Sequence, residues 1–420
     1  MQITTLPGSV DTLIVGAGQA GLVLSGMLSR AGHEHLLLEA RGSLGGGWQD
    51  RWDSFTLVTP NRVASLPGFP YDGPKPDGFM GRDEIAGRIA RYADVVAAPV
   101  AMSTRAERVL PADGGGFVVD TPRGSIRAKR VVVATGSYHQ PRVPAFAERL
   151  PSRVTQLHSH DYRNEGLLPH GGVLVVGSGQ TGVQLAEELH AAGRTVYLAV
   201  GRAGRLPRRY RGMDIFGWLV KLGTHGAEVG LGLPTPDQLP DPRLKFAAQP
   251  HLSGANGGHD TNLRQMAKDG IRLGGHLTAI DGEKVTFASD LAAQLEFADH
   301  FFDGQFRPLV DEFISRSGID AVPDDRVAVP FEPDPVLELD LADAGVSTVI
   351  WATGYGLDYG WIDAPILAER GYPVHTRGVT AVPGLFFLGL LWQSTIASAT
   401  LLGPMIDGPV VAEAVMGAEA

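Results

Sequence analysis

The residues whose spacing most clearly predicts chemistry lie in a glycine-rich stretch near the N-terminus. It reads Gly-Ala-Gly-Gln-Ala-Gly over residues 16–21 and follows the apolar run Asp11–Val15. In this arrangement the first glycine allows a tight turn, the second lets a diphosphate approach the backbone, and the third lets a helix pack closely on a strand. The start of that helix offers free N–H groups to an anion. We therefore expect a dinucleotide to bind to Gly16, Gly18, Gln19, Ala20 and Gly21.

An acidic residue closes the second strand of the same unit. Glu39 follows the apolar run Leu36–Leu38, where a carboxylate accepts hydrogen bonds from ribose hydroxyls. Because a carboxylate there repels a 2′-phosphate, this first site suits FAD or NAD and not NADP. We expect Glu39 and its neighbour Ala40 to contact the cofactor.

The same pattern recurs in the middle of the chain. An apolar run at 171–176 precedes Gly-Ser-Gly-Gln-Thr-Gly at 177–182, which predicts a second dinucleotide site. The strand at 195–200 is followed by arginines in place of an acid, and arginine forks match phosphate oxygens. We expect NADP here, although a solvated basic loop is the alternative. The expected contacts are Gly177, Gly179, Gln180, Thr181, Gly182, Arg202, Arg208 and Arg209.

Other stretches have residue types suited to the surroundings of a dinucleotide. Gly47 and Trp48 end a glycine cluster, in which the indole either covers a flat ring system or fills the core. The predicted strands 130–133 and 349–351 both run into Ala-Thr-Gly. We expect these turns to pass beneath the two dinucleotides, which adds four candidate contacts: Thr135, Gly136, Thr353 and Gly354.

Residues 379–406 carry no charge, a length that also fits a transmembrane helix. Prolines and glycines interrupt this stretch. It is therefore predicted to form a buried strand, a turn at Gly389 beside the cofactor, and a helix whose N-terminus points at the cofactor.

Composition narrows the class of protein. A chain of 420 residues with 44% hydrophobic residues is long enough for two domains. The net charge of -10 argues against nucleic-acid binding, and no polybasic patch indicates a membrane surface. No Lys or Arg precedes Arg30, so a signal peptide is not expected, and we predict a soluble cytoplasmic protein. The cysteine count of 0 excludes a disulfide or thiol mechanism, and two isolated His-x-His pairs do not predict a metal site.

The predicted fold class is α/β, with two Rossmann-like dinucleotide-binding domains. Residues 1–165 and 326–420 would form a discontinuous FAD domain, and residues 166–325 an inserted NADP domain. Helices are predicted over 82–92, 262–273 and 299–315. Residues 213–335 offer no recognisable site.

Together these motifs resemble the flavin-containing monooxygenase-like family of two-dinucleotide-binding flavoproteins, the class B flavoprotein monooxygenases. The resemblance covers nearly the whole chain. It rests on both glycine motifs, on Gly46-Gly47-Trp48, and on the two Ala-Thr-Gly turns with Tyr138 and Tyr355. Part of the family's F-x-G-x-x-x-H-x-x-x-Y/F fingerprint is present: His158 and Tyr162 match, whereas Ser152 and Val154 replace the Phe and the Gly.

The resemblance implies a reaction and its cofactors. NADPH would reduce FAD, and the reduced flavin with dioxygen would form a C4a-hydroperoxide. That species would oxygenate a small organic substrate at nitrogen, sulfur or a ketone. In the family an Asn after the Gly-Gly-x-Trp loop lies beside the flavin, and Asn61 matches it. The alternative for Asn61 is a turn residue after Pro60.

Other functions fit the same two sites. An NADPH:acceptor oxidoreductase, an NADPH oxidase and a flavin redox sensor without turnover are the alternatives. The sequence does not name the substrate. It leaves the oligomeric state open, with a homodimer among the possibilities.

Overall fold

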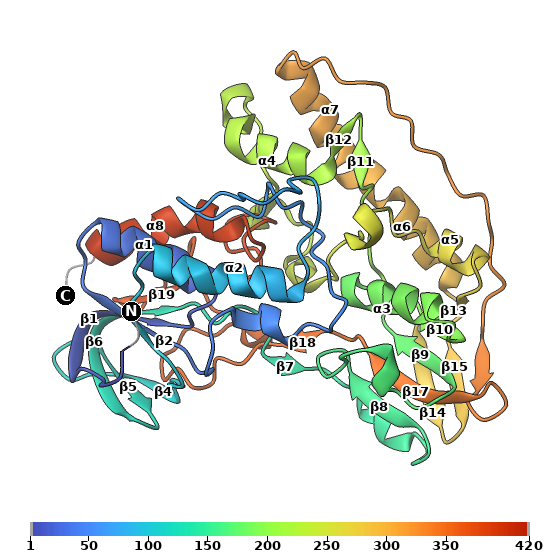
Figure 1. Cartoon of the computed structure of the whole chain (residues 1–420), viewed down its shortest axis with the longest axis horizontal. Coiled ribbons are helices and arrows are strands. Elements are labelled where there is room, and N and C mark those ends of the chain that lie inside the picture. Colours follow the sequence, from blue (N-terminus) through green and yellow to red (C-terminus); the bar gives the residue numbers. More distant parts are fainter. Residues whose placement is uncertain (1–2, 418–420) are drawn as a thin grey trace.

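The computed structural model describes residues 3–417, and its strands form two main sheets in separate lobes (Figure 1). The first sheet has the order β3-β2-β1-β6-β5-β4, and β19 also pairs with β6. Strands β1, β2, β3, β6 and β19 run parallel, whereas β4 and β5 continue from β6 as an antiparallel meander. The bounds are β1 Ser9–Val15, β2 His35–Leu38, β3 Val100–Ala101, β4 Arg108–Pro111, β5 Phe117–Thr121, β6 Gly124–Val133 and β19 Leu385–Phe387.

Strand β1 is apolar at successive positions because both faces of this sheet are covered. Ile14 packs into a cluster with residues of α1 (Gln19–Arg30), α2 (Arg82–Val95) and α8 (Gly403–Gly417). Leu13 and Val15 point to the opposite face and pack with Phe387 of β19 and with Tyr359. Because successive side chains of a strand point to opposite faces of the sheet, a sheet covered on both faces needs apolar residues at odd and at even positions.

The second sheet is fully parallel, with the order β13-β10-β9-β17-β8. Residues of α3, α5 and α6 cover one face, and a small antiparallel sheet of β14, β15 and β16 covers the other. The strands are β8 Thr155–His158, β9 Gly172–Val176, β10 Val196–Ala199, β13 Arg272–Gly274, β14 Leu277–Asp281, β15 Lys284–Phe287, β16 Glu338–Asp340 and β17 Val346–Trp351. The helices are α3 Gln180–Ala191, α5 Leu263–Lys268 and α6 Leu291–Gln305.

The α/β class with two Rossmann-like units is confirmed, but the boundaries between them differ from the prediction. Strand β17 pairs with β9 on one side and with β8 on the other, at residues that the prediction assigned to the first domain. The second unit therefore begins before β8 and ends after β17. The chain crosses between the lobes at β7 (Gln140–Pro141) and β18 (Tyr355–Gly356), which pair antiparallel.

The part of the chain that follows the second glycine motif holds a third group of helices. Helix α4 (Ile215–His225) and α7 (Arg307–Arg316) pack around Trp218 and Phe313, beside a hairpin of β11 (Arg209–Tyr210) and β12 (Met213–Asp214). The predicted helix over 262–273 is the short α5 followed by β13, because Gly270 turns the chain at a φ of 116°. The predicted helix over 299–315 is the end of α6 and all of α7, separated at Phe306.

The uncharged C-terminal stretch forms a strand, a glycine turn and a helix, as predicted. Strand β19 leads to Gly389, whose φ is 90°, and α8 begins at Gly403. Helix α8 packs on α1 in the first lobe (Figure 1). Among residues 3–417, no helix combines the length and the apolar character needed to cross a membrane.

Candidate functional site

The first glycine motif forms the turn between β1 and α1 with no room for side chains at two of its positions. Gly16 has a φ of 105°, and a Cβ there would lie 2.7 Å from the oxygen of Ala134. A Cβ on Gly21 would lie 2.0 Å from the oxygen of Gly16. At Gly18 the nearest heavy atom to such a Cβ is 3.9 Å away, on Gly46. The loop is therefore tightly packed inside and open at Gly18, which fits a diphosphate at the start of α1.

Glu39 lies at the carboxyl end of β2, next to this loop. Its carboxylate accepts from the backbone N–H groups of Ala17 (3.0 Å) and Arg41 (3.0 Å). Arg41 is in turn held by Asp50 through two hydrogen bonds of 2.7 and 2.5 Å. These bonds fix the acid at the edge where an adenosine ribose would lie.

A hydrogen-bond network joins the loop of Trp48 to the start of α1 and to the C-terminal segment before α8. The indole N–H of Trp48 donates to Gln19 Oε1 at 3.0 Å, and Gln19 Nε2 donates to the oxygen of Thr400 at 2.9 Å. Gly389 packs nearby, since a Cβ on it would lie 3.2 Å from that of Ala20. The network joins Gln19 and Trp48, which the sequence analysis assigned separately to the first cofactor, to the C-terminal segment at Thr400.

These parts surround one large cavity of about 1200 Å³. Its wall includes residues of both lobes, with Gln180, Ser159 and Tyr355 from the second. It also includes most of the residues predicted for the first dinucleotide: Gly16, Gly18, Gln19, Ala20, Glu39, Ala40, Gly47, Trp48, Thr135, Gly136 and Gly389.

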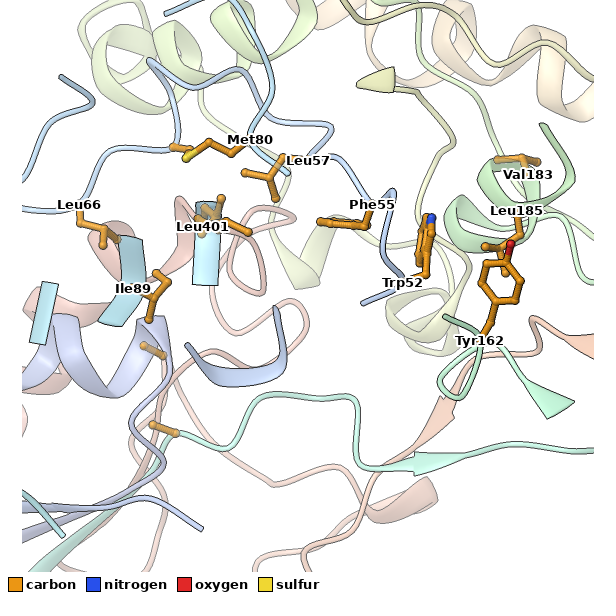
Figure 2. Packing of buried hydrophobic residues seen from close by; sticks show 14 of the residues in the cluster. Trp52, Phe55, Leu57, Leu66, Met80, Ile89, Tyr162, Val183, Leu185 and Leu401 are labelled. Atoms are coloured by element: carbon orange, nitrogen blue, oxygen red, sulfur yellow. The ribbon is translucent and has the colours of Figure 1, made fainter. Parts of the chain in front are cut away.

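Figure 2 shows how apolar side chains continue from one lobe to the other beside this cavity. Trp52, Phe55 and Leu57 lie in a row between Tyr162 and Leu401 (Figure 2). All three side chains of the row are buried and line the cavity. They form an apolar part of the cavity wall beside residues of both lobes.

The second glycine motif repeats the geometry of the first. Gly177 has a φ of 106°, and a Cβ there would lie 2.6 Å from the oxygen of Ala352. A Cβ on Gly182 would lie 1.8 Å from the oxygen of Gly177. The paired motifs and return strands thus form two equivalent turns. Those residues fit a second dinucleotide at the N-terminus of α3.

A segment of the chain covers this second turn in the structure. Gln180 Nε2 donates to the oxygen of Leu252, and the N–H of Leu252 donates to Gln180 Oε1 at 3.0 Å. A Cβ on Gly179 would lie 3.4 Å from that of Ala248. As a result only Gln180 of this motif lines the cavity, whereas Gly177, Gly179, Thr181 and Gly182 do not.

The three arginines predicted for the 2′-phosphate lie in different surroundings. Arg202 follows β10, is exposed, and lies over the ring of Phe297 at 4.0 Å, which leaves it accessible to a phosphate. Arg208 does not fit the prediction, because its guanidinium is buried and donates to Val58 O (2.8 Å) and Asp214 (2.6 Å). Arg209 is exposed but donates to Gly212 O at 2.8 Å within its own hairpin.

The second Ala-Thr-Gly turn serves the crossover between the lobes. Thr353 Oγ1 donates to the oxygen of Arg142, and Gly354 O accepts from the N–H of Arg142 at 3.0 Å. Neither Thr353 nor Gly354 lines the cavity, but Tyr355, the next residue, does. Burial raises the pKa of the Tyr355 phenol.

Asn61 is not brought to the cavity. Its side chain is 2% exposed, Nδ2 donates to Lys75 O at 2.9 Å, and Oδ1 has no hydrogen-bond partner. The cavity wall contains Leu57, Val58 and Thr59 of this segment but not Asn61. The predicted contact with a flavin therefore does not fit the structure, because the loop 75–78 holds the amide on the other side.

Sequence reasoning missed several residues of the wall. Arg51 stands three positions after Trp48, and Phe216 and Leu219 lie on one face of α4. His139 also lines the cavity, and burial lowers the pKa of its imidazole. The position of Arg51 three residues after Trp48 could have placed it near the cofactor, whereas α4 lies in a stretch without a recognisable motif.

Comparison with known proteins identifies the family. A model of the pyridine nucleotide-disulphide oxidoreductase family matches residues 13–211. An oxidoreductase from Geobacillus kaustophilus described as CzcO-like is 32% identical over 401 residues, which cover 95% of this chain and 96% of the relative. The chain belongs to the CzcO-like oxidoreductases. By family the chain is an FAD- and NAD(P)-dependent oxidoreductase.

Solved structures share the fold of this CzcO-like oxidoreductase across its whole length. A flavin-containing monooxygenase from Stenotrophomonas maltophilia superposes with a TM-score of 0.65 at 21% identity, covering 98% of this chain and 99% of that one. A bacillithiol disulfide reductase from Bacillus cereus superposes with a TM-score of 0.60 at 17% identity, covering 97% and 98%. The fold is thus common to monooxygenases and reductases.

Two chemical observations limit what the CzcO-like site can do. The chain has 0 cysteines, so it carries no redox-active disulfide, whatever the name of the matched family suggests. In the part of the chain that the structure describes, no group of three or more His, Asp or Glu side chains is arranged to hold a metal ion.

Proposed function

We propose that this CzcO-like oxidoreductase is an FAD- and NADPH-dependent monooxygenase. It would transfer one oxygen atom from dioxygen to a small organic substrate at a nitrogen, sulfur or ketone centre. The observation that carries the proposal is the single cavity lined both by the first glycine motif and by residues of the second unit. A site of this kind lets a nicotinamide, a flavin and a substrate meet in one cavity.

The residues of the first unit would hold FAD. The open position at Gly18 accepts the diphosphate, Glu39 faces the ribose, and Trp48 with Gln19 fixes the loop against the C-terminal segment. The bound flavin supplies hydride acceptance and oxygen activation, which no side chain of this chain provides. The protein's own contribution is to position the reactants and to exclude water.

Exclusion of water is the property that separates a monooxygenase from an oxidase. The buried row of Trp52, Phe55 and Leu57 forms one side of the cavity, and Ile396, Ala397 and Leu401 line it from the C-terminal segment. Such walls keep solvent from an activated oxygen species until the substrate reacts. The apolar side chains along this part of the wall favour oxygen transfer over simple electron transfer to an external acceptor.

NADPH is proposed as the electron donor. Arg202 stands at the end of β10, where the second strand of the unit places the ribose of a dinucleotide, and no acid occupies that position. Its exposed guanidinium can bind a 2′-phosphate, and stacking on Phe297 holds it in place.

The test is a coupling measurement on the FAD-loaded protein. NADPH consumption, oxygen consumption and hydrogen peroxide release are followed with a panel of thioethers, tertiary amines and ketones. A monooxygenase should show at least one compound that lowers peroxide release and yields an oxygenated product in equal amount to the NADPH consumed. Peroxide equal to NADPH with every compound would indicate an oxidase, and turnover only with an added electron acceptor would indicate a reductase.

A further inference from the structure

Arg51 carries a charge that forms no ion pair with any other residue between positions 3 and 417. Within residues 3–417 its guanidinium has no hydrogen bond and no ion pair, and its Nε atom is buried without a partner. The arginines around it differ, since Arg41 pairs with Asp50 and Arg82 with Asp53. A partly buried cation without a partner is unfavourable unless an anion joins it. Arg51 lines the large cavity, so that anion can come from a bound molecule.

Aromatic rings hold the guanidinium at the cavity wall. Its central carbon lies 5.9 Å from the ring of Trp48, 5.7 Å from that of Phe55 and 5.8 Å from that of Tyr138. Rings at these distances stabilise a cation through their faces but do not neutralise its charge, and the terminal N–H groups make no hydrogen bond within residues 3–417. A guanidinium held in this way is preorganised to bind a carboxylate through two parallel hydrogen bonds.

The charge faces the second lobe across the cavity. Tyr138 contacts Tyr355 with ring centres 5.3 Å apart, and Tyr355 follows β17 of the second unit. Burial raises the pKa of Tyr355, and the positive charge of Arg51 opposes that rise. Arg51 therefore lies where the two lobes meet, beside the space assigned to the reaction.

An apolar surface leads away from Arg51 along the same wall. The ring centre of Phe55 lies 5.7 Å from the central carbon of the Arg51 guanidinium, and Leu57 and Val58 follow Phe55 in the sequence and line the cavity. The oxygen of Val58 accepts from Arg208, whose guanidinium lies 5.5 Å from the ring of Phe216 on α4. Leu219, Leu233 and Phe306 complete this apolar end. The wall thus offers a cation at one place and a large apolar surface beyond it.

We propose that the substrate of this site is an organic acid with an apolar body. Its carboxylate binds Arg51, and its body lies along Phe55 and Leu57 toward Phe216. The inference rests on the proposed monooxygenase function and names the substrate class of that same cavity.

Binding to the FAD-loaded protein tests the inference without turnover. The probes are phenylacetate and octanoate, each compared with its primary amide, which keeps the shape and removes the charge. Calorimetric titration should give at least tenfold tighter binding of the acids. Arg51→Gln should weaken the acids at least tenfold and leave the amides unchanged. Arg91 is an exposed residue on α2, outside the cavity. Arg91→Gln makes the same chemical change there and should alter the affinity of neither the acids nor the amides.

Several results would overturn the inference. Equal affinity of acid and amide for the wild type would do so without any variant, which also covers the case in which Arg51→Gln fails to hold FAD. Weakened NADP⁺ binding in Arg51→Gln, with acid binding unchanged, would assign the cation to a dinucleotide phosphate. Failure of the proposed function is distinguishable, because an acid-selective cavity with no oxygenated product would leave the anion site in place and remove the monooxygenase.

Discussion

The alanine variant at Gly18 gives a direct test of the first dinucleotide site, because the structure separates binding from folding within one loop. Gly18 has φ and ψ of -78° and -170°, which any residue adopts. A Cβ there meets nothing closer than 3.9 Å, so Gly18→Ala should fold normally. At Gly21 the same Cβ would lie 2.0 Å from the oxygen of Gly16, so Gly21→Ala should disrupt the turn itself.

The expected loss in Gly18→Ala comes from the ligand and not from the protein. The added methyl occupies the space through which a diphosphate reaches the backbone N–H groups at the start of α1. A hydrogen bond to a charged group is worth about 1.5–3 kcal/mol, so each one lost should weaken FAD binding roughly ten- to hundredfold.

The assay measures both quantities on the same preparations. FAD affinity is obtained by fluorescence titration of the apoprotein, and the melting temperature of the apoprotein reports folding. Gly8→Ala, at an exposed position with nothing within 4 Å, is the matched control. Normal FAD affinity in Gly18→Ala would refute the assignment of this loop to the diphosphate. A melting temperature lowered as much as in Gly21→Ala would refute the geometric argument.

Three further expectations follow from individual side chains. Arg202→Ala should raise the KM for NADPH roughly ten- to hundredfold and leave the KM for NADH unchanged. An equal rise for both donors would indicate that Arg202 has a structural role. Arg208→Ala should instead lower the free energy of unfolding by about 2–4 kcal/mol, because the buried ion pair with Asp214 is lost. Asn61→Ala should lower the free energy of unfolding by about 1–2 kcal/mol through the lost bond to Lys75, with unchanged peroxide release, and a rise in peroxide would return Asn61 to the mechanism. Burial raises the pKa of Asp407 above 3.8, so the folded state binds this proton more tightly than the unfolded state does. The wild type should therefore lose stability relative to Asp407→Asn as the pH rises above about 4, and a difference in melting temperature that stays constant with pH would contradict this.

Much of the fold was predictable because its signals are local. The glycine spacing determines each turn, since a side chain at Gly21 or Gly182 would overlap the backbone of the same loop. Continuous apolar runs reveal strands covered on two faces, and the acid at Glu39 closes its strand within the same unit. These features are set by residues within about one βαβ unit of one another, so the sequence by itself determined the two glycine-rich turns and the strands and helices around them.

Tertiary structure decided the features that depend on residues distant in the sequence. Strand β17 entered the second sheet by pairing with β8 and β9, which no local pattern encodes. Arg208 does not face the phosphate site because its guanidinium donates to the oxygen of Val58, a residue 150 positions away in the sequence. In the sequence, Arg208 had been grouped with Arg202 because both follow the second glycine motif. One of the rings beside Arg51 at the cavity is that of Tyr138, which follows strand β6 and lies far from Arg51 in the sequence. The sequence alone does not distinguish an arginine that is buried in an ion pair from one that is exposed or faces a cavity. Only the packing of segments distant in the sequence determines which group neutralises its charge.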